Sequence, residues 1–336
     1  MPIRRAAVAA LAVLTVAGCS SGAESPADAP AAEGATVPVV ASTNVYGSIV
    51  EAVGGSRVSV DSLIDDPGAD PHSYETTPAD AAAVGRARLV VLNGGGYDDF
   101  VGQLVASSGT NPTVIDVAHV SGLATTEDAH ADDAHADQEY EDHAEAEGEE
   151  HGHDHGEFNE HFWYSLPTVQ KVATRVATDL GTVDPEGAAE FTANAKAFNA
   201  RVAELITRTE AIGAARPDAR VAVTEPVPGY LVETAGLTDV TPAEFTEAIE
   251  EDTDPPASVL RETLALFSDD PVRALIVNAQ TETPSTDQVR EAAQTAGVPV
   301  VEMTETMPEG VTGYADWMSG QIDALAGALG ATSSGS

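Results

Sequence analysis

Short apolar runs alternate with helical patterns along most of this 336-residue chain. In the first half the patterns predict strands at residues 37–43, 58–64, 89–92 and 113–117, and helices at 45–53, 78–85 and 97–107. Strands separated by a helix pair in parallel, because the helix carries the chain back across the sheet. We therefore predict an N-terminal α/β lobe, residues 37–120, whose mostly parallel sheet has helices on both faces.

The same alternation returns in the second half of the chain. It predicts strands at 220–224, 272–278 and 298–303, and helices at 229–235, 255–267, 286–296 and 314–329. These elements form a predicted C-terminal α/β lobe, residues 216–330, of the same class as the first.

Connector helices are predicted between the two lobes, over residues 161–215. One helical pattern ends at Leu180, and a second runs from Pro185 to Ala215. At 1.5 Å per residue, the second helix would be long enough to cross a domain of about 40 Å. We expect this long helix to bridge the lobes.

An acidic, histidine-rich segment interrupts the alternation. Residues 121–160 contain 15 acidic residues, no lysine or arginine and almost no large apolar side chain, so they cannot form a core of their own. Eight of the nine histidines lie between His119 and His161, and the ninth is His72. Imidazoles among carboxylates suit divalent transition metals, so we expect a disordered insert that either binds metal weakly or serves as a solvated spacer. The expected auxiliary ligands are His151, His153 and His155.

The N-terminus has the pattern of a secretory signal. Two arginines precede an apolar run, residues 6–17, which is too short to span a bilayer. The run leads to a Val-Ala-Gly-Cys sequence that resembles a bacterial lipobox and ends at Cys19, the only cysteine of the chain. We expect a signal peptide at residues 1–18 and a lipidated tether at 19–36, with no disulfide and no cysteine-based metal site.

The formal net charge of −40 excludes nucleic acid as a partner. The chain has no His-Glu-x-x-His, Walker A or dinucleotide-binding glycine motif, so we predict that it is not an enzyme. A secreted metallohydrolase would need three ligands, an open position for water and a general base, and no such catalytic spacing is present. A metal-buffering surface or adhesion protein is a further alternative.

Four residues near predicted strand ends or at the end of the insert have the chemistry of metal ligands. Open α/β sheets bind their ligands beyond the carboxyl ends of the strands. His72 follows the strand 58–64, Glu225 and Glu305 follow later strands, and His161 lies where the insert meets the connector. Two imidazoles and two carboxylates suit Zn²⁺ or Mn²⁺ and would complete a four-coordinate zinc.

Other assignments of these residues remain open. Glu302 or Glu282 could replace Glu305 as the second carboxylate ligand, and Glu225 could be a solvated loop acid. Aromatic residues near a site more often form its wall than carry its chemistry, so we assign Tyr97, Trp163 and Tyr164 to packing around the cleft.

An ordered set of motifs resembles the solute-binding lipoproteins of zinc and manganese ABC importers. The motifs, besides the lipobox, the insert and the long connector, are Asp70-Pro-His-Ser-Tyr74, Asn93-Gly-Gly-Gly96, Glu160-His-Phe-Trp163, Thr224-Glu225 and Thr304-Glu-Thr306. The resemblance covers residues 37–329 and depends on the order of the motifs rather than on any one of them. It implies two α/β lobes bridged by a backbone helix, with a metal buried between them. The ligands that it implies are His72, His161, Glu225 and Glu305.

The resemblance also implies a role and a location. The protein would deliver metal to an ABC permease and its ATPase, as a monomer anchored by lipid to the outer face of the cytoplasmic membrane, in the cell envelope. Many zinc carriers have a third histidine where this chain has Glu225, and manganese carriers have glutamate there. A histidine-rich insert accompanies zinc in the resembling proteins. We predict Zn²⁺ as the bound metal, with Mn²⁺ as the alternative.

We predict that Cys19→Ser abolishes lipid anchoring, because the thiol is the only atom that can carry the lipid. The variant should be released in soluble form or remain as an uncleaved precursor, as fractionation and mass spectrometry would show. A processed, membrane-bound lipoprotein in this variant would contradict the assignment.

Overall fold

A computed structural model describes residues 36–66, 74–123, 158–268, 270–311 and 313–331. The N-terminal sheet has the strand order β2-β1-β3-β4, and every neighbouring pair is parallel. Its strands are β1 (Val37–Thr43), β2 (Val58–Ile64), β3 (Leu89–Leu92) and β4 (Thr113–Asp116).

Both faces of this sheet are covered, and alternate side chains of each strand enter different cores. Val39 and Ala41 of β1 pack in a core with helix α1 (Asn44–Gly54), whereas Val40, between them, packs with α2 (Pro78–Val84) and α3 (Asp99–Ser107). The side chains of a strand point alternately to its two faces, so an unbroken apolar run is what a doubly covered strand needs.

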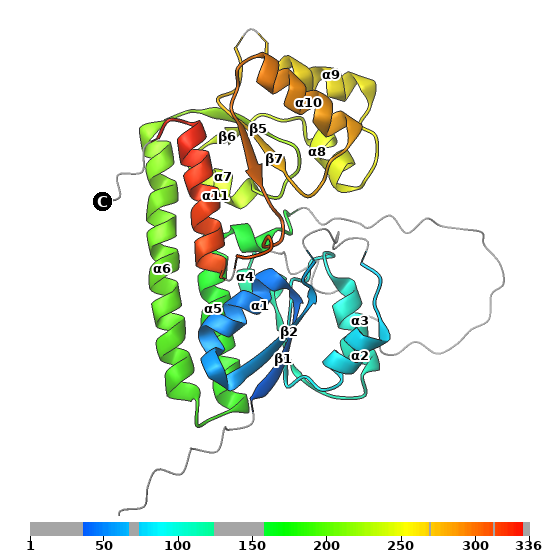
Figure 1. Cartoon of the computed structure of the whole chain (residues 1–336), viewed down its shortest axis with the longest axis vertical. Helices are drawn as coiled ribbons and strands as arrows, with labels where there is room; N and C mark the ends of the chain where they lie inside the picture. Colours follow the sequence, from blue (N-terminus) through cyan, green and yellow to red (C-terminus); the bar gives the residue numbers. More distant parts are fainter. Residues whose placement is uncertain (1–35, 67–73, 124–157, 269, 312, 332–336) are drawn as a thin grey trace, which may run out of the picture. The chain divides into compact units, whose positions relative to one another are not determined.

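The C-terminal sheet repeats this arrangement, with the order β6-β5-β7-β8 and parallel pairing throughout. Its strands are β5 (Arg220–Val223), β6 (Thr238–Asp239), β7 (Leu275–Asn278) and β8 (Val300–Met303). Its helices are α7 (Gly229–Thr234), α8 (Ala243–Glu250), α9 (Ala257–Ala265) and α10 (Pro284–Thr295). The predicted fold class, two parallel-sheet α/β lobes flanked by helices, is confirmed (Figure 1).

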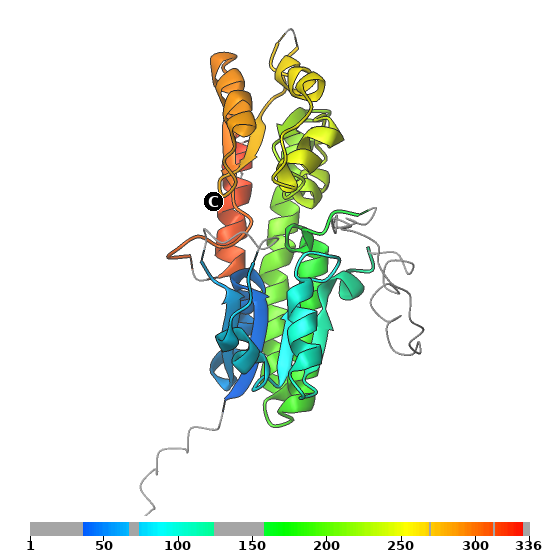
Figure 2. The same cartoon turned by 90° about the vertical axis from the view of Figure 1, so that its right-hand side faces the viewer.

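Two long helices and the last helix connect the sheets. Helix α5 (Leu166–Val183) packs against α6 (Ala188–Ala215), and α6 also contacts α1 of the first lobe and α7 and α11 (Tyr314–Ala328) of the second. Figures 1 and 2 show α6 running beside elements of both lobes. One hydrophobic core includes side chains from both sheets and all three of these helices.

Several boundaries differ from the prediction. Helix α5 continues past Leu180 to Val183, and α6 begins at Ala188 rather than at Pro185. The sequence patterns missed β6, the helix α4 (Val117–Ser121), the 3₁₀ helix Phe162–Tyr164 and α8. The predicted insert was too wide at both ends, because residues 121–123 and 158–160 belong to the described fold.

Helix α8 had a detectable signal. Phe245, Ala248 and Ile249 have the spacing of one helical face, and all three are buried.

The length of α6 agrees with that of the predicted connector helix. Its 28 residues, at about 1.5 Å per residue, make it about 42 Å long. Among the described helices, none is long and apolar enough to cross a membrane.

A glycine of α6 makes a close approach possible between the connector and the C-terminal lobe. A Cβ atom added at Gly213 would lie 2.2 Å from the backbone oxygen of Ala235, which follows α7. By contrast, a Cβ at Gly320, on the exposed side of α11, meets nothing within 4 Å.

We therefore predict opposite effects of two alanine substitutions. Gly213→Ala should lower the free energy of unfolding by about 1–3 kcal/mol, since backbone atoms must shift to admit the methyl group. Gly320→Ala should raise it by about 0.5–1 kcal/mol, the ordinary helix gain. Urea denaturation measures both, and a stabilised Gly213→Ala would show that the close approach does not exist in solution.

Candidate metal centre

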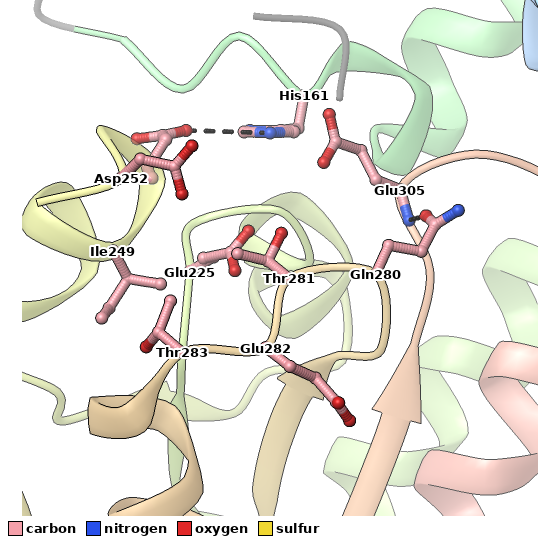
Figure 3. Close-up of a pocket in the computed structure, with 10 residues that line it drawn as sticks. His161, Glu225, Ile249, Asp252, Gln280, Thr281, Glu282, Thr283 and Glu305 are labelled. Atoms are coloured by element: carbon pink, nitrogen blue, oxygen red, sulfur yellow. Dashed lines mark hydrogen bonds and ion pairs between the residues drawn. The ribbon is translucent and has the colours of Figure 1, made fainter. Parts of the chain in front are cut away.

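Three of the four predicted ligands line one cavity. Glu225 follows Thr224 at the carboxyl end of β5, Glu305 follows β8, and His161 directly precedes the 3₁₀ helix Phe162–Tyr164. Together with Glu250 they line a cavity of about 190 Å³ (Figure 3). Strands β5 and β8 lie on either side of β7 in one parallel sheet, so their carboxyl ends lie at the same edge, which explains how residues 80 positions apart, 225 and 305, come together.

The orientation of His161 is set by Asn159. The backbone N–H and the ring Nδ1 of His161 lie 3.0 and 2.8 Å from the Asn159 side-chain oxygen. The Asn159 amide nitrogen donates to the backbone oxygen of Pro226 at 2.7 Å, so the amide oxygen must face the histidine. Nδ1 therefore carries the proton, and Nε2 has the lone pair that a metal requires.

Asn278, the last residue of β7, holds the two predicted carboxylates. Its amide nitrogen donates to Glu225 Oε2 at 2.8 Å and to Glu305 Oε2 at 3.4 Å. The other oxygen of Glu225 is buried and has no hydrogen-bond partner among the described residues. A buried carboxylate oxygen without a donor is costly unless a cation binds it.

Glu305 has two further supports. The Tyr97 hydroxyl donates to Glu305 Oε1 at 2.6 Å, and the backbone N–H of Glu305 donates to the side-chain oxygen of Gln280 at 2.6 Å. Trp163 packs against Tyr97 and His161, with ring centroids 4.8 and 5.1 Å away, which agrees with the packing role expected for it. The expectation for Tyr97 was incomplete, because its hydroxyl also orients a predicted ligand.

The two alternatives to Glu305 are placed differently. Glu302 points to solvent and pairs with Arg290 at 2.8 Å. Glu282 lines the cavity but remains 67% exposed in its side chain, 3.7 Å from the same arginine. Only 7% of Glu305 is exposed, so its position is the one that a buried metal site needs.

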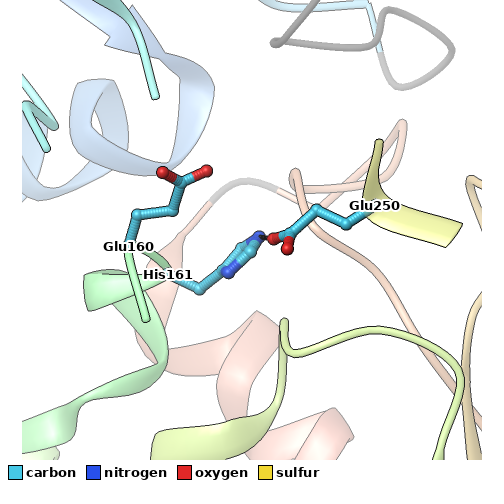
Figure 4. A group of neighbouring side chains, drawn as sticks. All are labelled: Glu160, His161 and Glu250. Atoms are coloured by element: carbon cyan, nitrogen blue, oxygen red, sulfur yellow. Dashed lines mark ion pairs between the residues drawn. The ribbon is translucent and has the colours of Figure 1, made fainter. Parts of the chain in front are cut away.

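Two carboxylates beside His161 were missed. Glu160 and Glu250 each offer an oxygen, and these lie with a His161 ring nitrogen within 4.8 Å of one another (Figure 4). Glu250 Oε1 is 3.7 Å from His161 Nε2. Glu250 ends helix α8, so the failure to predict that helix also concealed this residue. Glu160 was named only as part of a motif.

Burial and mutual repulsion keep protons on these carboxyl groups. Desolvation, opposed by the Asn278 hydrogen bond and reinforced by the charges of Glu305 and Glu250, raises the pKa of Glu225 to about 8. Desolvation and the Glu305 charge raise the pKa of Glu250 to about 8. The pKa of Glu160 rises to about 9, through desolvation and then the Glu250 charge. A divalent cation at the site would lower all three pKa values, because it stabilises the ionised carboxylates.

The remaining predicted ligands lie outside the described residues. These are His72 and the insert histidines His151, His153 and His155, and the same holds for Cys19. The described part of the site thus supplies one oriented imidazole and several carboxylates. This nitrogen and oxygen donor set fits a divalent transition metal, and the orphaned oxygen of Glu225 fits a bound cation.

Sequence comparison finds relatives that are named for metal binding. The chain is 28% identical over 192 residues to the manganese-binding lipoprotein MntA of Halalkalibacterium halodurans, which covers 57% of this chain and 53% of MntA. It is 26% identical over 174 residues to the high-affinity zinc uptake system protein ZnuA of Yersinia pestis, covering 51% and 54% of the two chains. The matched region is therefore about half the length of these curated relatives.

Solved structures share the fold over most of the chain. The solute-binding protein FpvC of Pseudomonas aeruginosa, in complex with Ni²⁺, superposes with a TM-score of 0.66 at 23% identity, covering 88% of this chain and 97% of FpvC. A crystal structure of ZnuA gives a TM-score of 0.65 at 22% identity, with 88% and 97% covered.

The family described as the zinc-uptake complex component A, periplasmic, matches residues 39–328. That range contains all of both sheets except the first two residues of β1, together with the connector helices and every described residue of the cavity. The resemblance inferred from the motifs is confirmed: this chain belongs to the ZnuA family of metal-binding substrate-binding proteins.

Proposed function

We propose that this protein captures a divalent transition metal, Zn²⁺ or Mn²⁺, and delivers it to the permease of an ABC importer that is driven by its ATPase. The observation that carries the proposal is the cavity in which the lone pair of His161 Nε2 meets buried carboxylates, one with an orphaned oxygen. The names of the curated relatives, a zinc uptake component and a manganese-binding lipoprotein, support it.

The metal would bind to His161, Glu225 and Glu305, with His72 as the fourth ligand. Packed elements and hydrogen-bonded amides hold His161, Glu225 and Glu305, so little ordering of these three residues remains to oppose binding. The insert histidines would bind more weakly, because a segment of this composition cannot form a core and each site there would have to be ordered on binding. Zn²⁺ was the metal predicted from the insert, and Mn²⁺ is favoured by the carboxylate at Glu225.

The cellular setting follows from the sequence and the family. A lipid on Cys19 would hold the protein at the outer face of the cytoplasmic membrane, and the tether 19–36 would let it reach the permease as a monomer. No catalytic role is proposed. The four proposed ligands would complete a four-coordinate zinc and leave no position for an activated water.

We predict that His161→Ala lowers the affinity for both metals by about 100-fold or more, because it removes the only oriented imidazole of the described site. Titration against a competing chelator measures the loss. His119→Ala is the matched control, because His119 is exposed on α4, and it should bind as the wild type does. Equal affinity in His161→Ala and His119→Ala would refute the proposed site.

We also predict that the metal-free protein becomes less stable as the pH rises from about 5 to 8. The pKa of Glu225 is about 8 in the folded protein and has an ordinary value of 4.5 when unfolded, so between these pH values the folded state binds more protons. The free energy of unfolding therefore falls across this window. Thermal denaturation with a chelator present measures it.

Glu225→Gln should reduce this pH dependence, because it removes one of the groups that must be ionised at a cost. Glu262→Gln, on an exposed position of α9, serves as the control with the same replacement of a carboxyl group by an amide. An identical pH dependence in the two variants would show that Glu225 is not buried as described.

A further inference from the structure

Glu250 is an acid with only 12% of its side chain exposed, and it lies where the end of a helix disfavours a negative charge. It is the last residue of α8, where the helix dipole is negative, and Glu251 and Asp252 follow it. The charges of Glu305, Glu251 and Glu247 all act on it. Among the described residues its ion-pair partner is His161, and no lysine or arginine pairs with it. Such a carboxylate weakens the fold unless a cation reaches it.

The turn after α8 holds Glu250 at the cavity. Asp252 has a left-handed backbone, with φ of 54°, which a non-glycine residue adopts only in special turns. The Thr253 N–H donates to the Ala248 oxygen at 2.8 Å, the closing bond of a Schellman turn. The helix therefore stops sharply, and both Glu250 and Asp252 line the cavity.

The distance between Glu250 and His161 suits a shared ion. Glu250 Oε1 and His161 Nε2 are 3.7 Å apart, beyond hydrogen-bond reach. Two donors at this separation can each lie about 2.1 Å from one ion, with an angle near 120° at the metal. Glu225, whose buried Oε1 has no partner among the described residues, lines the same cavity. The cavity therefore holds more than a cluster of acidic residues. It is also lined by the imidazole of His161 and by the buried, unpartnered Oε1 of Glu225.

We propose that Glu250 is a further metal ligand and that it favours Mn²⁺ over Zn²⁺. This inference rests on the proposed function and names a residue that selects between the two metals. Zn²⁺ in a closed protein site takes four ligands, and the described residues His161, Glu160, Glu225 and Glu305 offer that many donors before Glu250 is counted. A fifth donor, a hard carboxylate, suits Mn²⁺, which accepts oxygen ligands in a larger coordination sphere.

The test compares Glu250→Gln with Glu251→Gln. Both variants replace one carboxyl group at the end of α8 with an amide, but Glu251 is exposed and does not line the cavity. Titrations of the purified protein with Mn²⁺ and with Zn²⁺, in competition with a chelator, measure the affinity of the tight site separately from that of weaker sites. We expect Glu250→Gln to lose about tenfold or more in Mn²⁺ affinity and about threefold or less in Zn²⁺ affinity. Glu251→Gln should change the two affinities alike and only slightly.

A second readout reports the geometry of the site rather than its affinity. Co²⁺ absorbs visible light strongly in a four-coordinate site and weakly when it has five or six ligands. Glu250→Gln should therefore increase the Co²⁺ absorbance relative to the wild type and to Glu251→Gln. Thermal denaturation without metal confirms that both variants fold.

Two results would overturn the proposal. One is an equal loss of Mn²⁺ and Zn²⁺ affinity in Glu250→Gln, and the other is a Co²⁺ spectrum that does not differ from that of Glu251→Gln. Failure of the proposed function would give a different result. The wild type would then bind neither Mn²⁺ nor Zn²⁺ tightly, or its affinity would be no higher than that of His161→Ala.

Discussion

The structure depends on one hydrophobic core that the two sheets share. Side chains of β1 and β3 on one side and of β5 and β7 on the other pack with α5, α6 and α11 in a single cluster. Burial of apolar area is the main force that favours folding, and here neither half can complete it alone. The shared core keeps the carboxyl ends of β5, β7 and β8 close to the segment that begins at Phe158, and the cavity forms where they meet.

The core stabilises the fold, whereas ionised carboxylates in the metal-free cavity destabilise it. Three glutamates have pKa values raised to about 8 or 9, because burial and mutual repulsion oppose their charges. Amide groups of Asn159 and Asn278 and the hydroxyl of Tyr97 orient the donors but bring no positive charge. The energy of the core therefore maintains a site whose charges can be balanced by a divalent cation.

Much of this could be predicted because it depends on local pattern and strand position. Apolar runs located the strands, and strand ends located Glu225 and Glu305. Glu250 and Tyr97 could not be placed in this way. Glu250 depends on a short helix after Pro242 and on the way that helix ends, and Tyr97 reaches Glu305 across 208 positions of sequence. Contacts of this kind depend on how the lobes pack, which periodicity does not encode.

One pair of contacts connects the loop of Glu305 to the first part of the chain. Asn44, at the start of α1, accepts from the backbone N–H of Met307 and donates to its oxygen, both at 3.0 Å, as a neighbouring strand would. Met307 lies two residues after Glu305. The position of this carboxylate is therefore shared between the two halves of the sequence. A chimera that joins the first half of one such carrier to the second half of another would preserve the loop of Glu305 only if it kept an amide at position 44.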